Sequence, residues 1–321
     1  SKFHKDGRPS RLAVVLNGSP LFTGGAGSGE SEIRRWIIEN DWLEAIVGLP
    51  DQLFYNTGIS TYVWIITNQK RPERRGKVQL IDATAAFEKM RKSLGNKRNT
   101  IPEAAIGEIT RTFGEMIEGE TSKVLRNEEF GYTRIRVERP IRMSYRITEA
   151  ALIKVLQTKS VFGRGAPLPQ RVLNAMDGWT AETLQAAVLK VLEAMPRDLV
   201  WNSNTSFMEE LKRRTKAAKI DLHRAYFFWL ASLFGAKDDT AEPFLKDGKI
   251  EADPDLRDFE NVPLTEDIAA YMAREVLPHA PDAWEDESDR RKGYEVPFTR
   301  LFYRYQPPRP LSEIDADLRR L

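Results

Sequence analysis

The segment LPDQLFYNTGIST, residues 49–61, has the residue types that best suit the binding of a planar ligand. Two adjacent aromatic residues, Phe54 and Tyr55, are followed by the small polar residues Asn56 and Thr57 and then by a glycine. Enzymes that modify a DNA base must hold that base outside the helix, and a loop aromatic side chain can stack on it. The alternative interpretation is that the aromatic side chain anchors its own loop to the core.

A second candidate site is the glycine-rich stretch at residues 24–29, which lies between an expected strand and an expected helix. With Asp51 further along the chain, it imitates the dinucleotide-binding fingerprint of an oxidoreductase. Two features oppose this interpretation: several residues separate the strand from the glycines, and Asp51 lies beyond the end of the next strand. An oxidoreductase requires a strand that ends directly at Gly24. The competing interpretation is a flexible loop before a capped helix.

Metal coordination is not expected from this sequence. The chain has no cysteine, which excludes both disulfides and thiolate ligands. Its histidines are His4, His223 and His279, and they are too far apart in sequence to match a metal-ligand motif. The lack of cysteine also favours a reducing compartment, so we expect a cytoplasmic protein.

Positive charge is concentrated in two regions, although the net charge of the chain is only +2. Between Gln69 and Arg98 there are ten Lys or Arg residues and three acidic residues. In the second region, residues 129–148, arginines alternate with apolar residues, which places them on one face of an extended segment. These arginines are Arg134, Arg136, Arg139, Arg142 and Arg146. Each region is interpreted either as a phosphate-binding surface or as a solvated face.

Alternating strand and helix patterns surround the candidate loop. We expect strands at residues 12–16, 42–48, 60–67 and 78–82. The first is a continuous apolar run, which is typical of a strand buried on both faces. A helix is expected at residues 31–40, with Ser31 as its cap and with Ile33, Trp36 and Ile37 on its buried face. The pattern indicates an open α/β sheet, whose ligands bind at the carboxyl ends of the strands.

Helical patterns dominate the remainder of the chain. Residues 100–127 are expected to be helical, residues 129–148 to form a hairpin or two extended segments, and Thr180 to cap a later helix. The most apolar run, residues 225–234, is too short to cross a membrane, and the start of the chain has no signal-peptide pattern. We therefore divide the chain into residues 1–99 (α/β), 100–148 (a helical and basic extended connector) and 149–321 (helical).

Several stretches together resemble one protein family. They are GRPSRLAVVLNGSPLF, GGAGSGESEIRRWIIENDWLEAIVGLPDQLFYNTGISTYVWIITN, GKVQLIDATAAFEKMRKSLGNKRN, DPDLRDFENVPLTEDI and GYEVPFTRLFYRYQPPRPLSEIDADLRRL. They resemble the modification subunits of type I restriction–modification systems, which methylate adenine N6 in DNA and use S-adenosylmethionine. The resemblance implies the carboxyl half of a methyltransferase α/β sheet, with its last strand antiparallel, followed by a mainly helical domain.

The resemblance also implies a site and partners. It gives Phe54 the role of stacking on a flipped adenine, with Tyr55, Asn56 and Thr57 as loop partners. The implied partners are duplex DNA, a specificity subunit, a second methyltransferase subunit and a restriction subunit, with no membrane. The family's glycine-containing cofactor loop and its Asn-Pro-Pro-aromatic loop do not occur in these residues. We therefore expect no catalytic or cofactor-binding residue here, a chain that starts just after the catalytic loop, and an inactive isolated chain. The alternative is a non-catalytic module that binds DNA and subunits.

Overall fold

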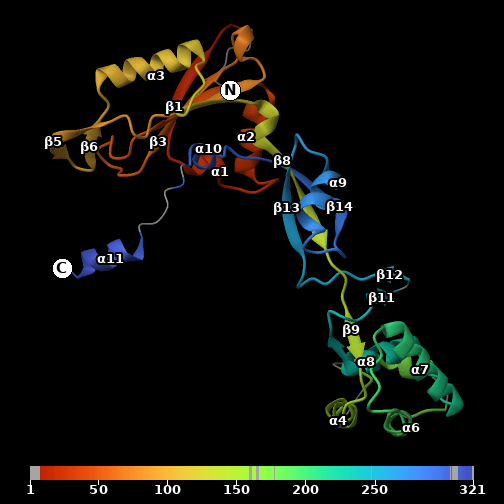
Figure 1. The fold of residues 1–321 in the computed structure, drawn as a ribbon. Helices are drawn as coiled ribbons and strands as arrows, with labels where there is room; N and C mark the ends of the chain where they lie inside the picture. Colours follow the sequence, from red (N-terminus) through yellow and green to blue (C-terminus); the bar gives the residue numbers. More distant parts are fainter. Residues whose placement is uncertain are drawn as a thin grey trace. The chain divides into compact units, whose positions relative to one another are not determined.

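The chain forms two compact units (Figure 1). The computed structural model describes residues 8–158, 161–163, 166–176, 178–246, 248–303, 305 and 310–319. Unit 1 consists of residues 1–136, 259–275 and 286–321, and unit 2 of residues 137–258 and 276–285. This division differs from the sequence-based boundaries at 99 and 148 because the chain returns to unit 1. Tyr294, Val296 and Phe298 are buried there beside Leu21 and Ile46, so the returning segment completes the unit 1 core.

Unit 1 is built on a five-stranded sheet in the order β1-β3-β2-β4-β7. The strands are β1 (Arg11–Leu16), β2 (Leu43–Leu49), β3 (Thr61–Thr67), β4 (Lys77–Asp82) and β7 (Ser122–Arg126). β2 and β4 are parallel, whereas β3 is antiparallel to both β1 and β2, and β7 is antiparallel to β4. The expected α/β sheet and its antiparallel strand are therefore confirmed. β7 replaces the end of the helix expected at residues 100–127.

Helices cover both faces of this sheet, because successive side chains of each strand point to opposite sides. The helices are α1 (Ser19–Phe22), α2 (Gly29–Glu39) and α10 (Phe298–Phe302) on one face and α3 (Glu103–Glu115) on the other. Ile46 and Trp64 belong to the core on the first face. Val47 and Ile81 pack with α3 residues on the second face. The sheet is thus the middle layer of three.

β1 differs from its expected environment. Although its sequence is continuously apolar, it is the edge strand, and Val14 and Val15 are 38% and 48% exposed. Within the described part of the chain its one strand neighbour is β3. The expectation of burial on both faces is therefore wrong for these residues, since no strand or helix covers the outer side of β1. The apolar edge remains accessible.

The α2 helix also buries an unexpected face. Ile33 and Trp36, which we expected to be buried, are 59% and 53% exposed. The residues that α2 buries are Ser31, Arg34 and Ile38. Its cap is Ser28, whose side chain accepts a hydrogen bond from the Ser31 N–H at 3.3 Å. Ser31 instead accepts the Tyr294 N–H at 3.0 Å, so the predicted cap joins the helix to the returning segment.

Arg34 links three separate parts of unit 1. Its side chain is buried, and its Nε donates to the Tyr294 carbonyl at 2.5 Å. The remaining guanidinium nitrogens donate to the carbonyls of Pro20 (3.1 Å), Thr23 (2.8 Å) and Gly24 (3.1 Å). Burial lowers the pKa of Arg34. These four bonds fix the loop before α2 and the segment that returns from unit 2.

The other elements of unit 1 are short. They are the strands β5 (Glu88–Leu94), β6 (Lys97–Thr100), β8 (Gly131–Glu138), β13 (Asp258–Pro263) and β14 (Trp284–Tyr294) and the helices η1 (Pro72–Arg74), η2 (Asn127–Phe130), α9 (Ile268–Tyr271), η3 (Met272–Val276) and α11 (Leu311–Leu318). β5 and β6 form an antiparallel hairpin. A three-stranded sheet has the order β13-β8-β14, and most of its residues belong to unit 1.

Unit 2 is mainly helical, as expected. Its elements are α4 (Glu149–Gln157), α5 (Gln170–Asn174), α6 (Ala181–Glu193), α7 (Asn204–Ala217) and α8 (Arg224–Phe234), with the short strands β9 (Met143–Tyr145), β10 (Gly235–Lys237), β11 (Leu245–Lys246) and β12 (Lys249–Ile250). Thr180 caps α6 as predicted, and Leu184 and Val188 are fully buried on the predicted stripe. In the described ranges no helix combines the length and the apolar character needed to cross a membrane.

Replacing Arg34 by methionine is expected to destabilise unit 1 by roughly 3 kcal/mol or more. The methionine fills most of the volume but leaves several buried carbonyls without a donor, and each such group costs about 1–3 kcal/mol. Urea unfolding of the chain measures this loss. Arg35→Met is the matched control, because the Arg35 side chain is 39% exposed and forms ion pairs with Glu32 and Glu39. Surface pairs contribute at most about 1 kcal/mol, so equal effects of the two substitutions would contradict the proposed role of Arg34.

Candidate functional site

The candidate loop, residues 50–60, lies at the carboxyl edge of the sheet. It leaves the end of β2 and returns as β3. Strand register places Leu16 and Gly48 opposite Tyr62, and Asp82 opposite Gly48. The segments that follow β1 and β4 therefore start at the same edge as this loop. In open α/β sheets this edge is where ligands bind.

Aromatic residues fill the base of the loop. A Cβ atom on Gly48 would come within 2.8 Å of the Phe298 ring and 3.3 Å of the Tyr62 ring, so only glycine fits there. The Phe298 and Tyr62 rings meet edge to face, with centroids 5.1 Å apart. Burial, and secondarily the carboxylate of Asp82, raises the pKa of Tyr62. The returning α10 helix thus supports the strand end from which the loop leaves.

The four predicted site residues form one tight turn. An isolated β-bridge pairs Phe54 with Thr57, so Tyr55 and Asn56 occupy the tip. Phe54 and Thr57 are half-buried and Asn56 is exposed, whereas Tyr55 is 63% exposed. The structure therefore brings the predicted residues together, with Phe54 at the base of the turn and Tyr55 as its most accessible ring.

The β5–β6 hairpin holds the first half of the loop. Gln52 has a left-handed backbone (φ 53°), and its carbonyl accepts the N–H groups of Arg98 (2.9 Å) and Asn99 (3.1 Å). The buried Asn99 side chain donates to the carbonyl and the carboxylate of Asp51 at 3.1 and 3.0 Å. Asp51 and Gln52 are therefore fixed by hydrogen bonds to the hairpin rather than by the sheet.

The tip of the hairpin lies against Tyr55. The Asn96 N–H donates to the Tyr55 carbonyl at 3.1 Å, and the Lys97 ammonium lies 5.3 Å from the Tyr55 ring centroid. Gly95 has φ 63°, and a Cβ there would come within 2.7 Å of the same carbonyl. We missed this hairpin because its strands are polar and lack apolar alternation. The available signal was the two-residue Gly95-Asn96 turn between them.

Part of the first basic region is structural. Lys70 is buried. Its Nζ donates hydrogen bonds to the Asp41 carboxylate and to the Lys77 carbonyl, both at 2.6 Å. Burial lowers the pKa of Lys70 despite this counter-charge. Arg74 is also buried, 3.6 Å from Glu44 and stacked on Phe113 at 4.4 Å. These two cations stabilise unit 1 and do not face a ligand.

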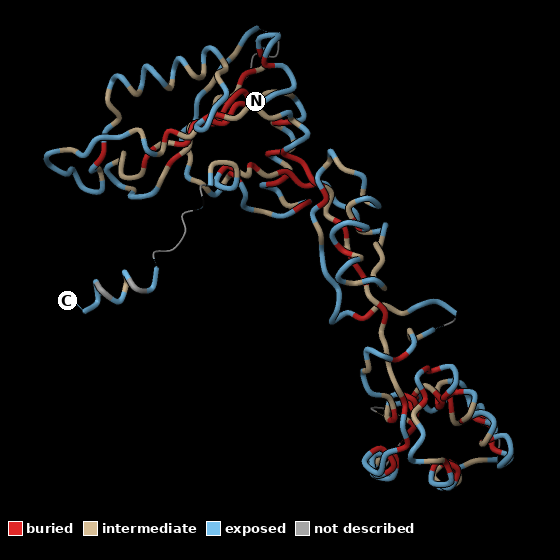
Figure 2. Tube along the Cα trace, in the orientation of Figure 1, coloured by how far each residue is buried: buried red, intermediate tan, exposed pale blue. Residues whose placement is uncertain are grey.

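The exposed charge of this region lies mainly on the hairpin. Its basic residues are Lys89, Arg91, Lys92, Lys97 and Arg98, and its one acidic residue is Glu88. Lys97 is half-buried and the other basic residues are exposed. Figure 2 shows the hairpin in the exposed colour over most of its length. Outside it, Arg71, Arg75 and Lys77 are exposed at the amino end of β4.

The second basic region is neutralised by acidic residues. Its predicted alternation is confirmed, since Ile135 and Val137 are buried between less buried arginines. The ion pairs are Arg136 with Asp286 and with Asp289 (3.5 Å), Arg139 with Asp282 (3.0 Å) and Arg142 with Asp282 (3.0 Å). Arg134 stacks on Phe259 at 3.8 Å. This pairing favours a structural role over phosphate binding.

The glycine-rich stretch does not fit a dinucleotide or another phosphate-bearing cofactor. β1 ends at Leu16 and α1 follows it, so no strand ends at Gly24 and the oxidoreductase interpretation is wrong. The Gly24 carbonyl is taken by Arg34. A Cβ on Gly24 would meet Ser28 Oγ at 2.3 Å and the Glu30 carboxylate at 2.9 Å. The chain's own side chains fill this loop, and the carboxylate would repel a phosphate.

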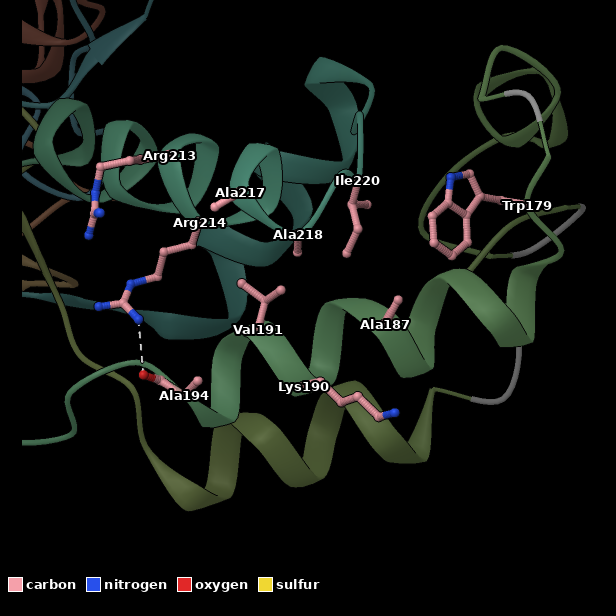
Figure 3. A pocket seen from close by; sticks show the side chains of 10 residues that line it. All are labelled: Trp179, Ala187, Lys190, Val191, Ala194, Arg213, Arg214, Ala217, Ala218 and Ile220. Atoms are coloured by element: carbon pink, nitrogen blue, oxygen red, sulfur yellow. Dashed lines mark hydrogen bonds between the residues drawn. The ribbon is translucent and has the colours of Figure 1, made fainter.

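Cavities also lie elsewhere, one of them in unit 1 and others in unit 2. An apolar cavity of about 460 Å³ opens between β1, β3 and α2 in unit 1, and Val14, Ile33 and Trp64 line it. In unit 2, a cavity of about 660 Å³ lies between α6 and α7 (Figure 3). Arg214 lines it but donates to the Ala194 carbonyl at 3.0 Å and pairs with Glu210. The other charged residues of its described lining are Lys190 and Arg213, so this lining holds cations but no carboxylate or histidine.

The histidines do not form a site. His223 accepts the Ala225 N–H at 3.1 Å and caps α8, and His279 is exposed. His4 lies outside the described residues. Across the ranges that the structure describes, no three His, Cys, Asp or Glu side chains gather as metal ligands would.

Part of unit 1 is similar to proteins of a known family. Residues 2–134 match the model of the N-6 DNA methylase family, and this confirms the resemblance for that part of the chain. The relatives are methylase subunits of type I restriction enzymes. The MjaVII subunit of Methanocaldococcus jannaschii is 42% identical over 79 residues, which are 25% of this chain and 13% of that protein. The HindI subunit of Haemophilus influenzae is 45% identical over 56 residues, 17% of this chain and 12% of that protein.

Solved structures include similar proteins. The type I methyltransferase subunit of Streptococcus thermophilus is 28% identical, with a TM-score of 0.33, over 37% of this chain and 24% of that one. A modification subunit of a type I enzyme from Vibrio vulnificus is 17% identical, with a TM-score of 0.29, over 37% of this chain and 23% of that chain. The matched part of this chain thus spans less than one quarter of each solved relative and a smaller share of the curated ones.

Asn99→Ala is expected to loosen the candidate loop without unfolding unit 1. The substitution removes the bonds to Asp51, and an unsatisfied partner costs about 1–3 kcal/mol. Local opening of residues 51–57 should become roughly ten- to hundredfold more frequent. Hydrogen–deuterium exchange of that peptide measures it. Asn96→Ala is the control because its side chain is exposed. Unchanged exchange in Asn99→Ala would show that the hairpin does not hold the loop.

Proposed function

We propose that this chain is part of the DNA adenine-N6 methyltransferase subunit of a type I restriction–modification system. It contributes the loop that stacks on the target base, together with contacts to DNA and to other subunits. The observation that carries the proposal is the aromatic turn 54–57 at the carboxyl edge of the sheet, held beside an exposed basic hairpin. The relatives that match unit 1 are type I methylase subunits, which supports the same reading.

The turn suits a flipped adenine for physical reasons. An extrahelical base loses its stacking in the duplex, and an aromatic ring recovers about 1–3 kcal/mol of it. Phe54 is half-buried at the base of a bridged turn, so little conformational entropy is lost when it stacks. Asn56 and Thr57 place hydrogen-bonding groups near the edge of such a base. In this proposal Phe54 binds and orients the adenine, and Tyr55 extends the apolar surface.

The exposed edge of the sheet supports the proposal that base binding and cofactor binding belong to different parts of the methylase subunit. Val14 and Ile33 are exposed and line the 460 Å³ cavity, and Val15 and Trp36 are exposed elsewhere on β1 and α2. An accessible cavity with an apolar lining is typical of an interaction site. We propose that the remaining sheet of the methylase subunit covers it and holds S-adenosylmethionine, which supplies the methyl group when bound. The specificity subunit, a second methyltransferase subunit and the restriction subunit are the other proposed partners.

The isolated chain is expected to lack measurable affinity for S-adenosylmethionine and to leave DNA unmethylated. The side chains of Ser28 and Glu30 fill its glycine-rich loop, Arg34 takes the Gly24 carbonyl, and the family's cofactor loop does not occur in these residues. Isothermal titration tests this directly. Saturable micromolar binding would mean that a cofactor site exists within these 321 residues.

Phe54→Ala in the complete methylase subunit is expected to reduce the methylation rate roughly ten- to hundredfold. The reason is the loss of about 1–3 kcal/mol of stacking, with about 1.4 kcal/mol per factor of ten. Phe54→Tyr and Phe54→Trp should retain more activity because they keep a flat ring. Melting temperature is the control measurement. If Phe54→Ala lowers the melting temperature sharply while the folded enzyme methylates normally, Phe54 anchors the core and does not stack on the base.

The alternative function is a non-catalytic module that binds DNA and partner subunits. The exposed apolar edge of β1 and the basic hairpin favour it, because both are binding surfaces without catalytic groups. Methylation by the complete subunit separates the two. A complete subunit that binds its partners but never methylates adenine would favour the module.

A further inference from the structure

The β5–β6 hairpin is strongly basic and lies beside the aromatic turn, and the pairing of its two strands requires neither feature. It carries five basic residues against one acidic residue, and it projects from the sheet edge where the aromatic turn lies. We propose that this hairpin is a phosphate-binding arm that holds the DNA backbone beside the base bound by the turn. The inference rests on the proposed function, since it names how that same site takes hold of its DNA.

The cations of the hairpin are available to a ligand. Lys89, Arg91 and Lys92 are exposed, and within the described part of the chain none of them forms an ion pair. The basic residues of the other segments differ. Lys70 and Arg74 are buried and pair with acidic side chains, and Arg136 pairs with Asp286 and Asp289. Carboxylates of the same chain thus neutralise those cations, whereas Lys89, Arg91 and Lys92 have no such partner among the described residues.

The hairpin is also mechanically joined to the turn. Gln52 and Tyr55 accept hydrogen bonds from its backbone, and Asn99 ties it to Asp51. A phosphate bound by the hairpin is therefore positioned relative to Phe54 and Tyr55 by protein contacts on the same loop. The Lys97 ammonium beside the Tyr55 ring places a cation next to the aromatic surface itself. Cations combined with an adjacent ring are what single-stranded or extrahelical nucleotides bind.

Duplex DNA is favoured over an acidic protein surface as the partner. Phosphate contacts fix the register of a protein on DNA, and a base held outside the stack needs its flanking backbone fixed. An acidic protein surface would account for the charge but not for the bonds that connect the hairpin to the aromatic turn. Those bonds hold the hairpin and the turn in one fixed arrangement, which is what two elements need in order to bind a base and its flanking phosphates together.

The test uses the complete methylase subunit assembled with its specificity subunit. The variant carries Lys89→Glu, Arg91→Glu and Lys92→Glu together, and the matched control carries Arg71→Glu, Arg75→Glu and Lys77→Glu. The control changes the same number of exposed charges at the opposite, amino end of β4. Affinity for a duplex with one recognition site is measured between about 50 and 200 mM salt, the range in which phosphate contacts change affinity strongly.

We expect the hairpin variant to bind more weakly and to lose salt dependence. Each lost phosphate contact reduces the slope of log affinity against log salt by about 0.9, so three reduce it by about 2.7. The control variant should keep the wild-type slope. A hairpin variant with the wild-type slope, or a control variant with an equal loss, would overturn the inference. A variant that still binds DNA normally but no longer assembles with the other subunits would overturn it in favour of an acidic protein partner.

A second reporter separates this inference from the proposed function. The target adenine is replaced by 2-aminopurine, whose fluorescence rises when it leaves the stack. At saturating duplex the hairpin variant should keep this signal, whereas Phe54→Ala should keep the salt slope and lose signal. If the wild-type assembly neither methylates adenine nor gives a signal, the proposed function fails, while the slopes still decide whether the hairpin binds phosphate. Neutral Lys89→Gln, Arg91→Gln and Lys92→Gln changes remove the same three contacts without adding negative charge, so they should give the same loss of slope if the charge reversals disturb folding.

Discussion

The buried guanidinium of Arg34 is the interaction on which unit 1 depends. A buried charge is costly unless hydrogen bonds satisfy it, and here four backbone carbonyls do so. Three of those carbonyls precede α2 in the chain, and the fourth belongs to Tyr294, at the end of β14. One side chain therefore closes a loop of the polypeptide that includes all of unit 2. Because Val296 and Phe298 follow Tyr294 directly, the same closure brings α10 against the sheet.

This closure reaches the candidate site through Gly48. Phe298 lies so close to Gly48 that no side chain fits there, and its ring packs on Tyr62 at the start of β3. Phe298 thus packs against both strand ends that carry the aromatic turn, the end of β2 and the start of β3. The β5–β6 hairpin supports the turn from the side through Gln52 and Asp51. A turn held in two directions can keep Phe54 in place without a large core of its own, which is what a rigid base-binding surface requires.

Sequence patterns predicted the elements whose burial follows their own periodicity. The strands β2, β3 and β4 and the stripe of Leu184 and Val188 on α6 are examples. The β5–β6 hairpin escaped prediction because most of its side chains are polar, and β7 escaped because its partner is β4, a strand distant in sequence. The role of Arg34 escaped for a similar reason, since an arginine on a helix predicts exposure unless its carbonyl partners are known. The turn residues 54–57 could be proposed from the sequence because aromatic and small polar types are informative without knowledge of their partners.

The wrong predictions of burial for β1 and α2 indicate which surface of unit 1 is suited to binding another polypeptide segment. Ala13, Val14 and Val15 of β1 and Ile33 and Trp36 of α2 have the residue types of buried elements, yet the described structure leaves them exposed. Composition is selected in the context in which a protein works, so an apolar strand at a sheet edge indicates a covering surface rather than an error of periodicity. Val14 of β1 and Ile33 of α2 line one apolar cavity. An accessible apolar cavity beside an edge strand is typical of a surface that binds another polypeptide segment, because an uncovered apolar edge favours association.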